Sequence, residues 1–202
     1  DSQYYLAYIE HKEDNHKLYQ KQMQWIADHK DSENIRFVMH MGDVVNSNLR
    51  AEYVVAQEAQ KKISDVGIPY SISTGNHEYK KGDSDNSYPS RSRTLFGEYF
   101  NDDFIKSSYA GKDLSWFHGF KWTANMYATF EVGNLKFAVI ALEYAPRKDI
   151  LCWADNLIST DLKDRYVILT THAYLGNDGL SNDKSGELKY TYFNGVTTKN
   201  GD

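Results

Sequence analysis

Three short apolar runs of the chain each end in side chains that can bind a cation or transfer a proton. They are residues 35–41 before Asp43, residues 69–74 before Asn76 and His77, and residues 166–171 before His172. Carboxylate, amide and imidazole groups are metal ligands, and imidazole also exchanges protons near neutral pH. Each is ordinary on its own, because aspartate or asparagine after glycine is typical of a turn and a single histidine at a strand end is more often structural. The coincidence of all three points to one shared site.

A layered α/β fold would bring these side chains together, because the loops beyond the carboxyl ends of its strands face one crevice. The apolar runs predict strands, and Gly133-Asn134 between residues 127–132 and 135–142 predicts a β-hairpin. Amphipathic patterns predict four helices, over residues 14–30, 51–66, 93–100 and 150–158. Residues 80–92 are polar and are expected to form a loop. This alternation favours an α/β domain over a helical bundle or a β-sandwich.

The composition limits the domain count and the partners. At 202 residues, 41% of them hydrophobic and with no linker or repeat, the chain is predicted to form a single domain over residues 1–202. The 23 basic residues against 28 acidic ones leave a net charge of −5, so no nucleic-acid partner is predicted. No apolar run approaches the roughly 20 residues that span a bilayer. The single cysteine, Cys152, excludes an internal disulfide and a zinc site built from cysteines.

Four short motifs follow one another along the chain: Asp1-Ser2-Gln3, Gly42-Asp43-Val44-Val45-Asn46, Gly75-Asn76-His77-Glu78 and Thr171-His172. In this order they resemble the motifs of the calcineurin-like metallophosphoesterase superfamily. The Asp-x-Gln opening and the Leu-Glu-Tyr-Ala-Pro-Arg stretch at residues 142–147 are similar to bacterial branches that are often exported. The serine/threonine protein phosphatases differ, because their first motif continues with Asp-Arg-Gly. The resemblance implies an α/β fold, the four-layer α-β-β-α sandwich of two packed sheets with helices outside.

The resemblance also implies a hydrolase of phosphate mono- or diesters with two divalent or trivalent metal ions. Two cations roughly 3.5–4 Å apart can clamp a phosphoryl group and supply a hydroxide for in-line attack. By this resemblance Asp43 bridges the ions, Asp1 and Gln3 face one of them, and Asn76 and His172 face the other. Mixed nitrogen and oxygen ligands suit Zn, Mn or Fe better than Ca. Because Gln3 stands where many relatives have a histidine, Mn or Mg is expected to be tolerated there.

Three other residues take roles in this expected reaction. His77 is interpreted as the general acid that protonates the leaving alkoxide, a task that suits imidazole. Asn46 occupies the place where some relatives have an acid that orients this histidine, and its amide can hold the ring without adding a charge. Arg147 could bind the substrate phosphate through its planar guanidinium, or it could be a surface arginine at a helix start. The expected substrate is a small phosphate ester or a phospholipid-like one.

Both ends of the chain depart from the superfamily pattern. The family's motifs end in Gly-His-x-His, whereas His172 is the last histidine here, and the first family motif follows a strand, whereas Asp1 is the first residue. We therefore expect a partial domain that lacks terminal elements and two ligands. Three protein ligands would remain for each ion, which predicts weak metal binding and low activity. The alternative is a non-catalytic binding or scaffolding module that keeps the fold with an incomplete metal site.

The other conspicuous side chains have simpler interpretations. His40 lies inside the first predicted strand and is expected in the core. Solvated positions are expected for His11, His16, His29 and His118. An irregular aromatic stretch could stack on a sugar, base or lipid, although loop packing is favoured: Trp116, Phe117, Phe120 and Trp122. Cys152 lies in an apolar helical segment and is expected to be buried. The motifs of serine hydrolases, phosphate-binding loops, dinucleotide folds and His-Glu-x-x-His zinc proteases do not occur in the sequence.

Overall fold

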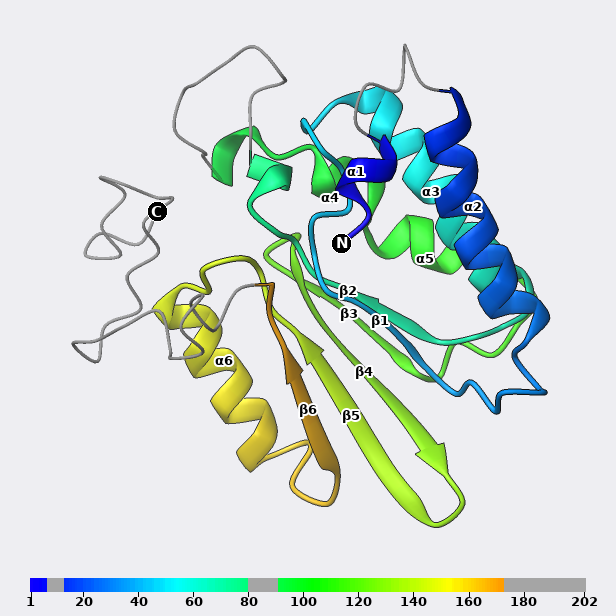
Figure 1. The fold of residues 1–202 in the computed structure, drawn as a ribbon. Coiled ribbons are helices and arrows are strands. Elements are labelled where there is room, and N and C mark those ends of the chain that lie inside the picture. The colour runs from blue at the N-terminus through cyan, green and yellow to red at the C-terminus, as the bar shows by residue number, and fades with distance from the viewer. Residues whose placement is uncertain (7–12, 80–90, 173–202) are drawn as a thin grey trace, which may run out of the picture.

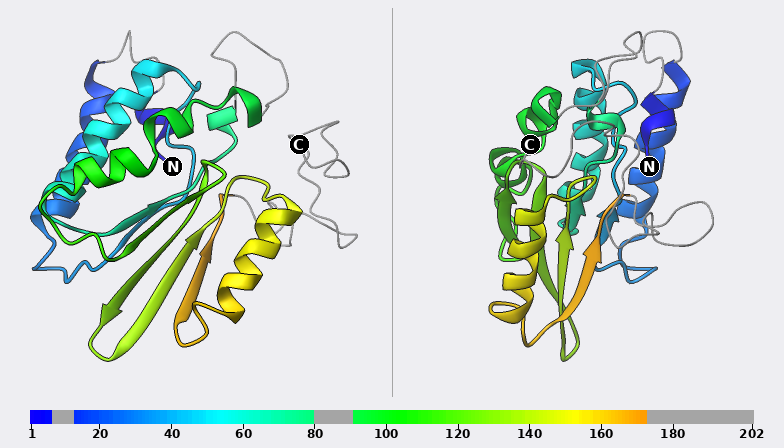
Figure 2. Two further views of the ribbon diagram at one scale, coloured as in Figure 1. Left: turned by 180° about the vertical axis from the view of Figure 1, so that it is seen from behind. Right: turned by 90° about the vertical axis from the view of Figure 1, so that its left-hand side faces the viewer.

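The computed structural model describes residues 1–6, 13–79 and 91–172. In it, two sheets pack against each other between outer helices (Figure 1). Helices α2 and α3 cover the two-stranded sheet, and α6 covers the far face of the four-stranded sheet, as the two further views confirm (Figure 2). The fold is therefore the predicted α/β sandwich with the layer order α-β-β-α.

Six α-helices and two short 3₁₀ turns lie in the described residues. The helices are α1 (Gln3–Leu6), α2 (Glu13–Asp28), α3 (Arg50–Asp65), α4 (Phe96–Tyr99), α5 (Asp102–Ser108) and α6 (Lys148–Ser159), and the turns are η1 (His77–Tyr79) and η2 (Arg91–Arg93). Helix α3 shows why the predicted helices form, since its buried Tyr53, Ala56, Gln60 and Ile63 recur at helical spacing. None of the described helices is long and apolar enough to cross a membrane.

The strands form two separate sheets. They are β1 (Val38–His40), β2 (Tyr70–Ile72), β3 (Phe117–Lys121), β4 (Asn125–Val132), β5 (Leu135–Ala141) and β6 (Tyr166–Thr170). Strands β1 and β2 are parallel neighbours, and the second sheet has the order β3-β4-β5-β6. Strands β4 and β5 form the predicted hairpin, and β6 runs parallel to β5. The carboxyl ends of β1 and β2 therefore lie side by side, and so do those of β5 and β6.

The two faces of β5 separate two apolar clusters. Ala138 and Ile140 pack against Ile150 of α6. Ala141 points the other way and joins the larger cluster, which lies between the sheets and under α2 and α3. This alternation with a period of two residues is what a strand buried on both faces requires.

Helices α1 and α5 and strand β3 differ from the sequence prediction, and the helix predicted over residues 93–100 is limited to α4. Helix α5 was not expected; it has only seven residues, and it begins because the Asn101 side chain accepts a hydrogen bond from the Phe104 N–H at 2.9 Å. The aromatic stretch expected to be irregular contains strand β3. A shift of register between Phe117 and Phe120, with Gly119 at φ +95°, interrupts the alternation that would have revealed this strand. The loop predicted over residues 80–92 lies mostly outside the described residues.

Several expectations about single side chains are corrected. Cys152 is exposed, because the buried face of α6 is formed by other residues, Ile150, Ala154 and Leu157. His29 is partly buried, with its ring centroid 4.3 Å from that of Trp25, whereas His118 is exposed as expected while its ring stacks on Tyr127 with centroids 4.4 Å apart. The side chains of His11 and His16 lie outside the described part of the structure. Three of the four aromatic residues expected to pack in a loop belong to the core or pack against it: Trp116, Phe117 and Phe120. The fourth, Trp122, is exposed.

Candidate metal centre

The loops after β1 and β2 touch because two glycines leave room for it. Gly42 has φ +88°, and a Cβ atom there would lie 2.8 Å from the Gly75 backbone nitrogen. A Cβ atom on Gly75 would in turn lie 2.5 Å from the Asp43 backbone nitrogen. Asp43 itself has φ +50°, which directs the chain sharply away from β1. The predicted motif residues therefore meet through close backbone contact that no larger residue allows at Gly42 or Gly75.

Glu78 joins these two loops, a role that sequence reasoning missed. Its fully buried carboxylate accepts hydrogen bonds from the Asp43 N–H at 3.0 Å, from the Val45 N–H at 2.9 Å and from the Gly75 N–H. Burial and then the neighbouring Asp43 charge raise the pKa of Glu78 to about 7. The position of the acid directly after the Gly-Asn-His triplet was the available signal, but only the fold shows that its partners are backbone amides.

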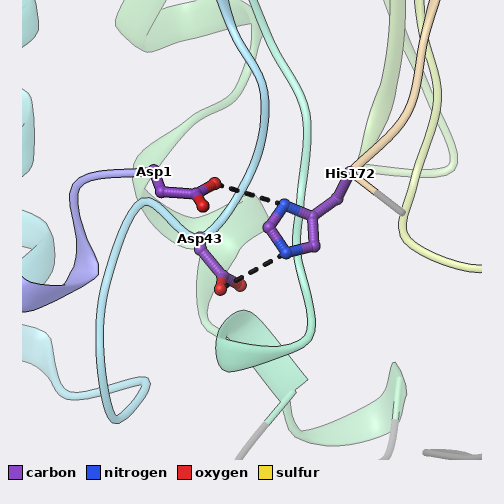
Figure 3. Close-up of side chains that lie close together, drawn as sticks. All are labelled: Asp1, Asp43 and His172. Atoms are coloured by element: carbon purple, nitrogen blue, oxygen red, sulfur yellow. Dashed lines mark ion pairs between the residues drawn. The ribbon is translucent and has the colours of Figure 1, made fainter. Parts of the chain in front are cut away.

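The side chains of Asp1, Asp43 and His172 converge at this edge (Figure 3). One ligand atom from each lies within 4.8 Å of the others. The His172 Nδ1–H donates to the Met41 carbonyl at 2.8 Å and lies 3.5 Å from an Asp1 oxygen. The His172 Nε2 faces the Asp43 carboxylate at 3.3 Å. An imidazole fixed by a carbonyl at one nitrogen, with the other aimed at a carboxylate, is the usual arrangement of a metal-binding histidine.

The charges of this cluster favour a cation between His172 and Asp43. Burial alone would lower the pKa of His172, but the contact with Asp43 raises it above its usual value. Burial alone would raise the pKa of Asp43, but His172 and then His77 hold it below its usual value. A positive charge between the imidazole nitrogen and the carboxylate is therefore stabilised by both groups. Either a proton or a metal ion can supply this charge.

The start of the chain is fixed against the same loop through Ser2. The Ser2 N–H donates to the Asp43 carbonyl at 2.9 Å, and the Ser2 hydroxyl donates to the Val44 carbonyl at 2.8 Å. Since that hydroxyl has only one proton, His40 Nε2 at 3.1 Å must be the donor to its oxygen. Ser2 thus holds Asp1 beside Asp43. The side chain of the next residue, Gln3, is buried, and its carbonyl oxygen has no hydrogen-bond partner in the described structure, so it is available to a cation.

His77 is also held at Asp43, with Asn46 beside it. The His77 N–H donates to Asp43 Oδ1 at 3.0 Å, and His77 Nε2 lies 3.9 Å from Asp43 Oδ2. The Asn46 contact differs from the prediction, because His77 Nδ1 donates at 2.6 Å to the backbone carbonyl of Asn46 and not to its amide. The Asn46 amide donates to Ser47 instead. Any residue at position 46 can supply this carbonyl, so the side-chain type could not reveal the contact.

The two remaining predicted residues are less directly connected to the cluster. Asn76 lies between Gly75 and His77 with a partly buried side chain. Arg147 lies at the start of α6 and binds the buried Glu143 carboxylate with two hydrogen bonds, of 2.8 and 3.1 Å. The structure thus gives this guanidinium a protein partner, and its contact with a substrate phosphate stays a prediction.

The burial of His40 leads us to expect that the folded protein loses stability in acid. It lies in the core as expected, and burial, followed by the charge of the amino terminus, lowers its pKa from 6.5 to about 3. Below pH 6.5 the unfolded chain takes up a proton that the folded His40 does not, so stability is lost as pH falls from 6.5 toward 3. This group should cost about 1.4 kcal/mol per pH unit, or about 2 kcal/mol by pH 5.

Urea unfolding of the native chain and the His40→Gln variant at pH 7 and pH 5 measures this effect. Glutamine keeps an N–H donor for Ser2 but does not titrate. We expect the variant to lose about 2 kcal/mol less than the native chain between the two pH values. Equal losses in both proteins would contradict the assignment to His40.

Comparison with known proteins identifies the family of the chain. A family model described as calcineurin-like phosphoesterase matches residues 14–197. The chain is similar to the uncharacterized protein YvnB of Bacillus subtilis (strain 168), with 27% identity over 177 residues. This match covers 87% of the chain but only 12% of the length of YvnB. Given the extent of the family match, the chain belongs to the calcineurin-like phosphoesterase family.

Proposed function

We propose that this domain hydrolyses phosphate mono- or diesters at a centre of two metal ions, with His77 as the general acid. The observation that carries the proposal is the convergence of Asp1, Asp43 and His172, with His172 Nε2 3.3 Å from the Asp43 carboxylate. The family's activity, metal-dependent hydrolysis of phosphate esters, agrees with this chemistry. The metal number, the ester class and the role of His77 go beyond the family assignment.

The donor set fits first-row metal ions. Asp43 would bridge the ions, Asp1 and Gln3 would complete one side, and Asn76 and His172 would complete the other. The unpartnered buried oxygen of Gln3 and the carbonyl-fixed ring of His172 support these two assignments. The mixture of oxygen and nitrogen suits Mn, Fe or Zn, and Mg is acceptable at the oxygen-rich side. When bound, such ions polarise the phosphoryl group and provide a hydroxide nucleophile.

His77 has the geometry of a proton donor. Its Nδ1–H is committed to the Asn46 carbonyl, so Nε2 is the atom that can deliver a proton. The Asp43 carboxylate, 3.9 Å from Nε2, stabilises a positive charge on the ring before transfer. The Asp43 contact to the His77 backbone fixes the distance between the acid and the metal ligands.

The leaving group of the substrate tests this role. His77→Gln should reduce hydrolysis of an alkyl phosphate by about 10²- to 10⁴-fold, which is the usual contribution of a general acid. The same variant should reduce hydrolysis of p-nitrophenyl phosphate much less, because nitrophenolate leaves without protonation. Steady-state rates in excess Mn²⁺ measure both. His29→Gln, directly after the end of α2, is the matched control and should leave both rates unchanged. An equal loss on both substrates would exclude His77 as the acid.

Metal occupancy separates the enzyme from the alternative module. We propose that Mn²⁺ or Zn²⁺ binds weakly, so occupancy should rise only with excess metal, and p-nitrophenyl phosphate hydrolysis should rise with it. Full occupancy and high turnover at equimolar metal would overturn the weak-binding proposal. Metal binding without hydrolysis of any mono- or diester would favour a binding or scaffolding module. Small phosphate esters and phospholipid-like esters are both suitable test substrates.

A further inference from the structure

The turn between β3 and β4 lies at the same sheet edge as the candidate metal centre. Lys121 pairs with Asn125 across this turn, and the start of β4 pairs with the end of β5, which in turn pairs with the end of β6 (Figure 1). The Asn125 side chain accepts a hydrogen bond from the Glu143 N–H at 2.8 Å. The next residue, Tyr144, places its ring centroid 5.9 Å from that of His172. The turn is therefore joined to the centre through residues 143–144.

Trp122 in this turn is exposed although its backbone conformation is unfavourable. Its exposed fraction is 56%, whereas Trp116 in the same aromatic stretch is 4% exposed. Trp122 and Thr123 have φ +55° and +62°, a conformation that costs about 1 kcal/mol or more for each residue with a side chain. Gly97 provides the space for the turn, since a Cβ atom there would lie 2.8 Å from the Thr123 Cβ. Core packing does not explain an indole that is held outward at this cost.

Two cations lie beside the indole. The Lys121 ammonium is 5.5 Å and the Arg147 guanidinium carbon is 5.6 Å from the Trp122 ring centroid. Glu143 pairs with Arg147 and also lies 3.6 Å from Arg91, whereas in the described part of the chain Lys121 has no carboxylate partner. The turn thus offers an aromatic face and one uncompensated positive charge to an anionic ligand, in a chain whose net charge is −5.

We propose that Trp122 and Lys121 bind the leaving group of the ester, and that this group is a planar aromatic one such as a nucleobase. The proposal rests on the proposed function, since it assigns a substrate class to that site. Stacking of a base on an aromatic side chain contributes about 1–3 kcal/mol. An exposed cation–π contact contributes about 0.5–1 kcal/mol, so a ligand ring can displace Lys121 from the indole face while Lys121 stays near the ligand's negative charge.

Substrate discrimination tests the proposal. In excess Mn²⁺, kcat/KM is measured for a nucleoside monophosphate, phenyl phosphate and glycerol phosphate. Trp122→Ala should lower the ratio of the nucleotide to glycerol phosphate by about 5- to 150-fold, which is 1–3 kcal/mol expressed as a rate ratio. Trp122→Phe should restore most of it. Trp25→Ala, which removes another exposed tryptophan on α2, is the matched control and should leave the ratio unchanged.

A direct measurement of nucleotide binding tests the role of Trp122 independently of the proposed hydrolysis. If the native chain hydrolyses no ester, the proposed function fails, and calorimetric titration with the nucleoside monophosphate in Mn²⁺ still decides the role of Trp122. Weaker binding by Trp122→Ala, with native thermal stability, supports the subsite. An unchanged rate ratio or unchanged dissociation constant in Trp122→Ala overturns it. A loss with phenyl phosphate as large as with the nucleotide identifies any aryl ester, and not the nucleobase in particular, as the group recognised.

Discussion

Replacing Asp43 with asparagine is expected to weaken metal binding by more than about 100-fold and to abolish phosphate ester hydrolysis. Loss of a hydrogen-bonding partner outside the ligand shell already costs about 10- to 100-fold in metal affinity, and Asp43 is assigned as the bridging ligand itself. Its carboxylate is buried, faces His172 at 3.3 Å and faces His77 at 3.9 Å. No other described carboxylate in the cluster is as deeply buried, since Asp1 is exposed.

The asparagine variant isolates the charge of this side chain from its structural role. Asparagine tolerates φ +50° as well as aspartate does, and its carbonyl oxygen can still accept the hydrogen bond from the His77 N–H. Thermal unfolding without metal should therefore change little, while calorimetric titration with Mn²⁺ and p-nitrophenyl phosphate hydrolysis should show the loss. Asp65→Asn removes an equal charge from an exposed position on α3 and is the matched control. Native-like Mn²⁺ affinity in Asp43→Asn would refute the bridging assignment.

The convergence of the predicted residues at one sheet edge could be anticipated because it depends on where strands end and not on their precise length. The first predicted strand covered residues 35–41, yet β1 covers only Val38–His40. Asp43 and His77 still meet, because parallel neighbours end at one edge whatever their length. The same reasoning brings His172 to this edge, although it is 131 residues away in the chain from its hydrogen-bond acceptor Met41.

The missed features depend on backbone atoms or on the conformation of loops and turns, which a single sequence does not reveal. Glu78 binds three backbone N–H groups, and the acceptor for His77 is the backbone carbonyl of Asn46. Backbone groups are present at every position, so residue type carries no sign of these contacts. Arg147 was identified as a planar donor, but its buried acceptor Glu143, four residues earlier, lies in the connection between β5 and α6, where no helix or strand spacing indicates the contact. The outward orientation of the Trp122 side chain could not be predicted for the same reason.

Gly75→Ala is expected to have the largest effect on the fold around the site. The alanine methyl group would lie 2.5 Å from the Asp43 backbone nitrogen and closer still to its Oδ1 atom, and the backbone cannot move without separating the loops after β1 and β2. Glu78 would then lose its shared hold on the Asp43 and Gly75 amides. Overpacking of this kind should cost about 3 kcal/mol or more in the free energy of unfolding. Metal binding should be lost with it, because the same movement takes Asp43 away from His77.

Gly133→Ala separates this steric effect from the general cost of replacing glycine. Gly133 lies in the β4–β5 turn with φ +59°, and a Cβ atom there would have no neighbour within 4 Å. Its replacement should cost only the backbone strain, about 1 kcal/mol, and should leave Mn²⁺ binding unchanged. Urea unfolding and Mn²⁺ titration of both variants provide the comparison. If Gly75→Ala were no less stable than Gly133→Ala, or bound Mn²⁺ as the native chain does, close contact between the two loops would not be what assembles the site.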